Sequence, residues 1–306
     1  MYYPYLRGKQ YELIALREFA QRYVGERKIV PIVEPVRSDL KSVVKTVGAL
    51  TDSQIECAVV LNPAQGDYER MAAGKSIVNA LVGKAYIPAF LMGGNEALVA
   101  QMITDCKLNN VMLVFTSGFD PENAVLKALS ENDAVKYFVG LDNRSLKKHF
   151  RATGKKVISL KDRFKKRPTN KDYSETVDEF YSDDHAFFGD EQVDGFSDYC
   201  VLPSEFIKGG TVPTYLAIHL SYKKSDDEVW VHHFVSDTPT SGNIQLKFKE
   251  ATEKVITFYA QRPHTIAVDD LLGYYNSGKF PGLGMLKKYT IANHFELMHG
   301  LMEGGE

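Results

Sequence analysis

The strongest constraint on the fold is a series of short apolar runs that alternate with amphipathic segments. The first run covers residues 29–33, and five more follow, spaced about 25 residues apart. The runs are almost entirely apolar and do not alternate with polar residues, which is typical of parallel strands covered on both faces. The later runs lie at 57–61, 86–91, 111–115, 135–141 and 157–160.

Six such strand–helix units in series predict an α/β fold, a TIM-like (β/α)8 barrel, with an open doubly wound sheet as the alternative. Residues 196–202 have the pattern of a seventh strand. Residues 214–222 and 229–235 are two further runs joined by the polar link KKSDDE, so we expect them to pair antiparallel. In this interpretation 229–235 is the eighth barrel strand and 214–222 is an inserted antiparallel strand. No GxGxxG or GxxxxGKS motif follows the first run, which disfavours dinucleotide-binding and P-loop folds.

The chain shows no linker, repeat or low-complexity tract, so we predict a single domain over residues 1–306. A helix near 9–23 makes residues 1–25 an N-terminal extension that caps one end of the barrel. Further helices are expected near 171–181 and at 243–260, where the second would close the barrel. Residues 265–306 form a C-terminal helical extension. The apolar faces of the terminal helices either cover the barrel or form a dimer contact.

Charge and cysteine content limit the partners and the cellular compartment that we expect for the protein. Lys+Arg is 37 and Asp+Glu is 39, so bulk charge predicts neither a nucleic-acid nor a membrane partner. Three widely separated cysteines without CxxC spacing fit a reducing compartment and argue against a structural zinc. The N-terminus lacks the apolar core of a signal peptide, and no apolar run approaches the roughly 18 residues that span a bilayer. We therefore expect a cytoplasmic protein.

In a (β/α) barrel the reacting groups lie at the carboxyl ends of the strands. Three carboxylates in such positions are the candidate catalytic residues, as base or metal ligand: Glu34, Asp142 and Asp237. Arginines there could hold an anion through bidentate contacts. The candidate anion-binding residues are Arg37, Asn62, Arg144 and Arg163. Because solvated loops are also polar, the alternative of a purely structural role stays open.

Charge is strongly segregated in the middle of the chain. Residues 144–171 contain twelve Lys/Arg and one acid, Asp162, whereas residues 172–198 contain ten Asp/Glu and no Lys/Arg. A basic barrel mouth would favour phosphate, a nucleotide, nucleic acid or an acidic protein. The alternative is that the two blocks neutralise each other, or are solvated surfaces.

Three histidines fall inside the late strands. Because side chains alternate along a strand, His232 and His233 point to opposite faces, and His219 on the paired strand meets one of them. Together with Asp198, His219 and His232 are a candidate acid–base or metal group. A histidine satisfied by its neighbours in the core is the alternative. No HExxH or HxH pattern is present, so no metal is firmly predicted and the cofactor stays unknown.

The segments YYPYLRGKQYELIALREF, PIVEPVR, FSDYCVLPSEFIKGG, IHLSY, VHHFVSD and LKFKEA together resemble the bacterial and phage "beta protein" family, over nearly the whole chain. The resemblance implies a barrel-like α/β fold. Some members of that family are encoded beside a small protein that looks like a restriction-type nuclease. The resemblance therefore implies an accessory or effector role in a phage-defence or toxin–antitoxin-like unit. It assigns no catalytic residue.

Two functional hypotheses follow. In the first, the barrel is an interaction module that binds a nuclease-like protein partner or nucleic acid. The second is an enzyme that acts on a phosphorylated or nucleotide-like anion at the barrel mouth. An open mouth lined by the charged strand ends would favour the enzyme, and a mouth plugged by terminal helices would favour the module.

Overall fold

The computed structural model describes residues 1–71, 73–116, 123–140, 144–209, 213–239 and 242–303. Its contacts divide the chain into two compact units, whereas the apolar pattern predicts one domain. The first unit comprises Met1–Lys161 and Phe187–Asp198, and the second comprises Asp162–Ala186 and Tyr199–Glu306. Each unit is therefore built from two separate stretches of chain.

The first unit contains eight parallel strands in a nearly closed barrel, as the sequence predicts. The strands are β1 (Tyr5–Leu6), β2 (Ile32–Val33), β3 (Ala58–Val60), β4 (Ile87–Met92), β5 (Val111–Phe115), β6 (Val135–Gly140), β7 (Lys156–Leu160) and β9 (Gly195–Ser197). They are hydrogen-bonded in that order. Tyr2 closes the ring, because it bridges in parallel to both Ile29 and Phe196.

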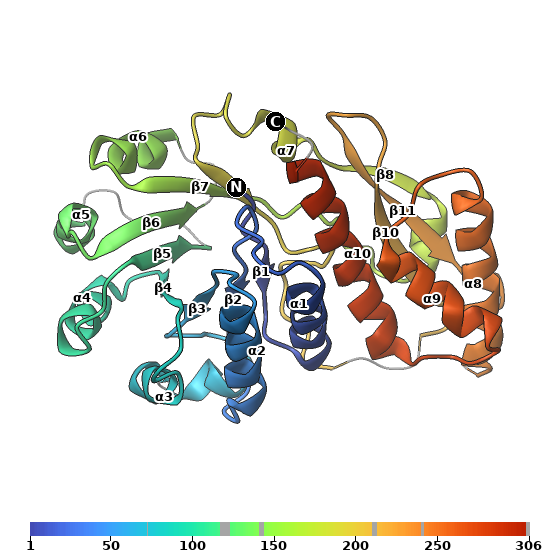
Figure 1. Cartoon of the computed structure of the whole chain (residues 1–306), viewed down its shortest axis with the longest axis horizontal. Helices are drawn as coiled ribbons and strands as arrows, with labels where there is room; N and C mark the ends of the chain where they lie inside the picture. Colours follow the sequence, from blue (N-terminus) through green and yellow to red (C-terminus); the bar gives the residue numbers. More distant parts are fainter. Residues whose placement is uncertain (72, 117–122, 141–143, 210–212, 240–241, 304–306) are drawn as a thin grey trace. The chain divides into compact units, whose positions relative to one another are not determined.

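Helices follow the strands along the outer side of this barrel (Figure 1). They are α1 (Gln10–Arg22), α2 (Lys41–Asp52), α3 (Gly74–Ala80), α4 (Glu96–Asp105), α5 (Ala124–Glu131) and α6 (Arg144–Ala152), with a short 3-10 helix, η1 (Gly66–Arg70). Helix α1 packs against α2. Aromatic side chains connect strand and helix: the rings of Phe138 on β6 and Phe150 on α6 stack at 3.6 Å. Burial of such apolar surface is the main stabilising term for the unit.

The strands at the closing edge differ from the prediction. Residues 1–25 are not only an extension, because Tyr5–Leu6 form the first barrel strand and α1 follows it. The run predicted as the seventh strand supplies the eighth, β9. The prediction that 229–235 is a barrel strand is wrong, because that segment pairs antiparallel in the sheet of the second unit. The N-terminal run is easy to miss: it is short, tyrosine-rich and contains Pro4, a residue that weakens a strand assignment.

The second unit is built on a three-stranded antiparallel sheet. Its order is β10 (Ala217–Lys223), β11 (Val229–Val235) and β8 (Asp178–Ser182). The predicted antiparallel pairing of the two late runs is confirmed. The helix predicted over 171–181 is wrong: a 3-10 turn, η2 (Lys171–Ser174), precedes β8. Burial alternates along the start of β8, where Glu179 and Tyr181 are buried and Asp178 and Phe180 are half-exposed, as expected for a strand.

Four helices accompany this sheet. They are α7 (Asp184–Phe187), α8 (Ile244–Tyr259), α9 (Ile266–Asn276) and α10 (Leu283–Glu303). Helix α8 contacts β10 and β11, so the prediction that this helix closes the barrel is wrong. Helix α10 contacts β10, and Figure 1 shows α8, α9 and α10 gathered around the strands of this unit. Within the described part of the chain, no helix is long and apolar enough to cross a membrane.

Candidate functional site

At the barrel, the predicted catalytic residue Glu34 is held by three donors. Its side chain is fully buried just after β2. The Tyr5 hydroxyl and the Arg7 guanidinium donate to Oε2 at 2.8 and 2.5 Å, and the Ala64 amide donates to Oε1 at 3.1 Å. These three bonds satisfy the hydrogen-bonding capacity of a carboxyl group that is removed from water. This geometry is that of a counter-ion that joins β1, β2 and the loop after β3.

The predicted anion-binding residues of the barrel do not form one cluster. Arg37 and Arg144 are exposed. The Asn62 amide is engaged on both sides by the backbone of Leu91, at 2.8 Å each. Asp198 is buried after β9 and accepts a hydrogen bond of 2.7 Å from the Tyr2 hydroxyl. Asp142 lies outside the described residues.

Two other predicted barrel-mouth residues belong to the second unit. Arg163 is bidentate to Asp184 there, with Nη2 2.7 Å from Oδ1 and Nε 3.0 Å from Oδ2. The placement of Asp237 at the end of the eighth barrel strand is wrong, since β11 is not in the barrel. Asp237 is instead an exposed partner of Lys254 at 2.7 Å. Both side chains are therefore satisfied by surface or local ion pairs.

Members of the basic and acidic blocks pair with each other within each unit. In the first unit Lys161 contacts Glu191 at 2.7 Å. In the second, Arg167 forms an ion pair with Glu179, alongside the Arg163–Asp184 pair. Mutual neutralisation, the alternative interpretation of the two blocks, therefore accounts for part of the charge segregation.

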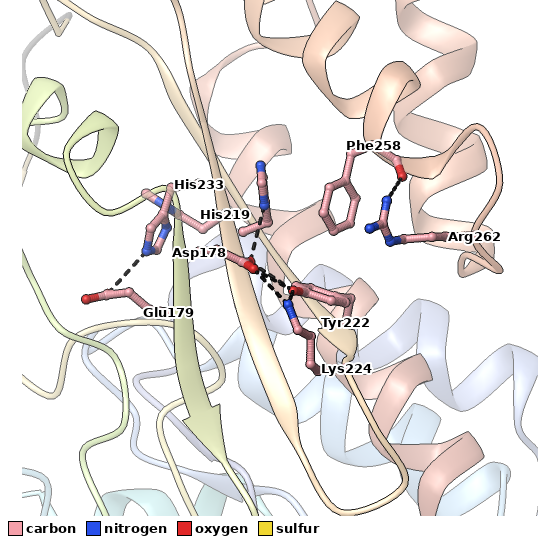
Figure 2. A network of polar contacts seen from close by, with 9 residues as sticks. Asp178, Glu179, His219, Tyr222, Lys224, His233, Phe258 and Arg262 are labelled. Carbon is pink, nitrogen blue, oxygen red and sulfur yellow. Dashed lines mark hydrogen bonds and ion pairs between the residues drawn. The ribbon is translucent and has the colours of Figure 1, made fainter.

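The histidines of β10 and β11 meet as the strand alternation predicts. His219 and His233 are directly paired across the two strands, and their Nδ1 atoms lie 2.7 Å apart. His233 Nε2 lies 3.3 Å from Oε2 of Glu179, on the next strand, β8. Figure 2 shows Glu179 directed toward His233. Glu179, His233 and His219 thus form a continuous hydrogen-bonded chain, which we call the histidine relay.

His232 faces the opposite side of the sheet and does not join the relay. Its Nδ1 lies 3.3 Å from Asp178, which also accepts a 2.8 Å hydrogen bond from Tyr222 and contacts Lys224. Figure 2 shows Tyr222 and Lys224 converging on Asp178. The His232 ring packs 4.3 Å from that of Phe258 on α8. Of the two histidines that His219 could meet, it therefore pairs with His233, and the candidate group of Asp198, His219 and His232 is not brought together.

The contacts of the relay determine where its protons lie. Glu179 is a carboxylate that Arg167 also contacts, so His233 donates to it from Nε2. The Nδ1 atom of neutral His233 is then an acceptor, and His219 must donate from its own Nδ1. This tautomer leaves the lone pair of His219 on Nε2. Among the described residues no hydrogen-bond partner is found for this Nε2.

The environment keeps both relay histidines neutral. Burial, and next the neighbouring His233, lower the pKa of His219 well below its usual 6.5. Burial also lowers the pKa of His233, although the adjacent Glu179 acts in the opposite direction. The rings of Phe164 and Tyr173 stand edge-on to His219 at 5.2 and 4.5 Å and form part of its apolar surroundings. At neutral pH the relay therefore presents an uncharged imidazole.

His219 lies in the wall of a cavity of about 350 Å³, here called the relay cavity. Three cationic side chains line it, Lys166, Arg167 and Lys287, and no carboxylate is found among its described lining residues. Apolar side chains, including Leu202, Leu283 and Leu286, supply the rest of the wall. His219 is the only described lining residue of a type that ligates zinc, and a single ligand does not make a metal site.

Sequence reasoning singled out His219 but missed Glu179 and placed Asp198 beside the histidines. The alternation of polar and apolar residues in DEFYS, at 178–182, could have indicated a strand that contains Glu179. It was hidden because the acidic residues around it favoured a solvated helix.

Comparison with known proteins gives no further assignment. No family model matches the chain, and neither a curated protein nor a solved structure matches it. The site is therefore interpreted from its own geometry.

Proposed function

We propose that the second unit binds a small amphipathic anion, with a phosphate-like or carboxylate head and an apolar body, in the relay cavity. The observation that supports the proposal is the composition of the cavity lining. Three cationic side chains and a neutral histidine lie among apolar side chains, and no carboxylate is found among the described lining residues. Ligand sites are typically apolar hollows of this size with a few polar groups placed to fix orientation.

The cations can respond to a ligand. Lys166 is paired with Glu205 at 2.5 Å, but the two side chains are 42% and 66% exposed. Such a solvent-exposed pair contributes at most about 1 kcal/mol, so an anion can compete for the ammonium group. Arg167 is more firmly held, because it contacts the nearly buried Glu179 and its backbone amide donates to the Tyr173 hydroxyl. Arg167 thus provides a fixed positive charge in the cavity lining, and Lys166 provides one that can move toward a ligand.

This proposal moves the enzyme hypothesis from the barrel mouth to the second unit. At the barrel, Glu34 is occupied by Tyr5, Arg7 and Ala64. In the relay cavity, His219 lies near cationic side chains, and no hydrogen-bond partner of its Nε2 is found among the described residues. The second arrangement is the one that suits recognition of an anion.

Titration calorimetry with phenyl phosphate tests the proposal, with benzyl alcohol as the neutral probe. We expect phenyl phosphate to bind and benzyl alcohol to bind at least tenfold more weakly. Lys166→Gln and Lys287→Gln should each weaken phenyl phosphate binding several-fold. Lys249→Gln, on exposed α8 surface and outside the cavity, is the matched control and should leave the affinity unchanged. Equal binding of the two probes, or equal effects of all three variants, would contradict the proposal.

A second candidate is binding of nucleic acid or an acidic protein partner, such as a nuclease-like protein, through α6. Arg144, Lys148 and Arg151 are exposed and recur at helical spacing, which gathers them on one face. Arg144→Glu/Lys148→Glu should abolish salt-sensitive binding to labelled duplex DNA and co-purification of a partner. Lys75→Glu, on exposed α3 surface, is the control. Binding that survives in the double variant would exclude this face.

A further inference from the structure

We propose that His219 is the general base of the relay cavity, acting on water beside a bound phosphate ester, and that His233 and Glu179 are positioning residues that take up the resulting charge. This inference rests on the proposed function, because the substrate is the anion bound in that cavity. It adds a reaction class, hydrolysis, and assigns a role to each residue of the relay.

The lone pair of His219 is on the atom that a general base needs. Nδ1 of His219 is committed to His233 at 2.7 Å, so the basic atom is Nε2. His219 lines the cavity, and its Nε2 has no hydrogen-bond partner among the described residues. A general base must reach the proton it removes directly or through one water, which a cavity-lining nitrogen can do.

The relay also provides a path for the proton. When Nε2 takes a proton from water, the oxygen of that water attacks phosphorus and the bond from phosphorus to the leaving oxygen breaks. The leaving oxygen takes a proton from solvent, and the relay later returns the proton it received to solvent, so the products are inorganic phosphate and the released alcohol or phenol. The Nδ1 proton of His219 can pass to Nδ1 of His233, so that the positive charge lies 3.3 Å from Glu179. The ion pair with Glu179 stabilises the charge on His233, whereas a charge kept on the half-buried His219 would lie farther from that carboxylate.

The opposite face of the same sheet carries a similar pair that lies outside the cavity. His232 and Asp178 likewise pair a histidine with a carboxylate at the neighbouring positions, but His232 packs on Phe258 and does not line the relay cavity. These residues provide matched controls, because each is adjacent in sequence to its relay counterpart. His232→Asn controls for His233→Asn, and Asp178→Asn controls for Glu179→Gln.

The first measurement is the tautomer, read from ¹⁵N-labelled histidine side chains by NMR between pH 5 and 8. We expect neutral His219 with its proton on Nδ1, and His233 with its proton on Nε2. His233→Asn retains an acceptor near the position of Nδ1, so the His219 tautomer should persist in that variant. A proton on Nε2 of His219 would overturn the inference, because the residue could then only donate into the cavity.

The second measurement is hydrolysis of p-nitrophenyl phosphate, followed by release of nitrophenolate. We expect His219→Gln to lower kcat at least 100-fold, in line with loss of a general base. His233→Asn should lower kcat about tenfold with little change in KM. Glu179→Gln should lower kcat and move the acid limb of the pH profile to lower pH, since the carboxylate raises the proton affinity of the relay. The two control variants should stay within twofold of wild type.

The outcomes separate the two proposals. If calorimetry shows no binding of phenyl phosphate, the proposed function fails. If p-nitrophenyl phosphate binds but is not hydrolysed, or His219→Gln hydrolyses it at the wild-type rate, the general-base role fails while the binding site stands. A Glu179→Gln variant with a lower kcat but an unshifted pH profile would reduce Glu179 to a structural residue and overturn the relay.

Discussion

Replacing Glu34 by alanine should destabilise the first unit without touching the proposed catalytic machinery. The fully buried carboxylate accepts from the Tyr5 hydroxyl, the Arg7 guanidinium and the Ala64 amide. Arg7 is only 17% exposed, so its charge loses a partner in a largely buried setting. Breaking a buried pair by removing one member costs about 3–5 kcal/mol. We expect Glu34→Ala to lower the free energy of unfolding by about that amount.

Urea unfolding monitored by far-UV circular dichroism measures this loss, and Trp230 fluorescence reports separately on the second unit, which contains the only tryptophan. Asp237→Ala is the control, because that carboxylate is 71% exposed and its pair with Lys254 contributes at most about 1 kcal/mol. A Glu34→Ala variant as stable as Asp237→Ala would refute the counter-ion role and return Glu34 to the catalytic candidates.

Two further predictions concern stability. Lowering the pH from 7 to 5 should reduce the free energy of unfolding, because burial lowers the pKa of His219, His232 and His233 below 6.5 in the folded protein. As the pH falls, the unfolded chain binds these protons before the folded protein does. Each histidine that stays neutral in the folded protein therefore lowers the free energy of unfolding by up to about 2 kcal/mol at pH 5. Equal urea midpoints at the two pH values would show this linkage to be absent. Gly66→Ala should cost more than about 1 kcal/mol, since φ is +68° and a Cβ would lie 2.1 Å from the Val36 carbonyl oxygen. Gly189→Ala, with nothing within 4 Å of a Cβ, is the control in the same thermal melt, and a Gly66→Ala variant that melts with it would contradict the strain argument.

Much of the barrel could be predicted from the chain because its strands are local signals. Runs such as 111–115 are wholly apolar, and burial on both faces leaves that mark in the sequence. The pairing of β10 with β11 was also predictable, since a short polar link leaves neighbouring strands only the antiparallel arrangement.

The parts that could not be predicted depend on contacts distant in sequence. Tyr2 forms a β-bridge to Phe196, which closes the barrel. This contact joins residues far apart in the sequence, so no local pattern in the tyrosine-rich N-terminal segment could predict it. The second unit likewise combines Asp162–Ala186 with Tyr199–Glu306. Strand β8 pairs with β11, although the barrel strand β9 lies between them in the sequence. For that reason Glu179 could not be placed beside His233 from the sequence, although the meeting of His219 with one of the two histidines could.

The most direct test of the central claim is the response of the histidine side chains to a bound anion. In ¹⁵N-histidine-labelled protein titrated with phenyl phosphate, the ring signals of His219 should shift in a saturable manner and those of His233 should follow more weakly. The signals of His232, on the opposite face of the sheet, should not move. No shift of His219 at saturating phenyl phosphate, or a shift of His232 as large as that of His219, would contradict the assignment of the relay cavity as the functional site.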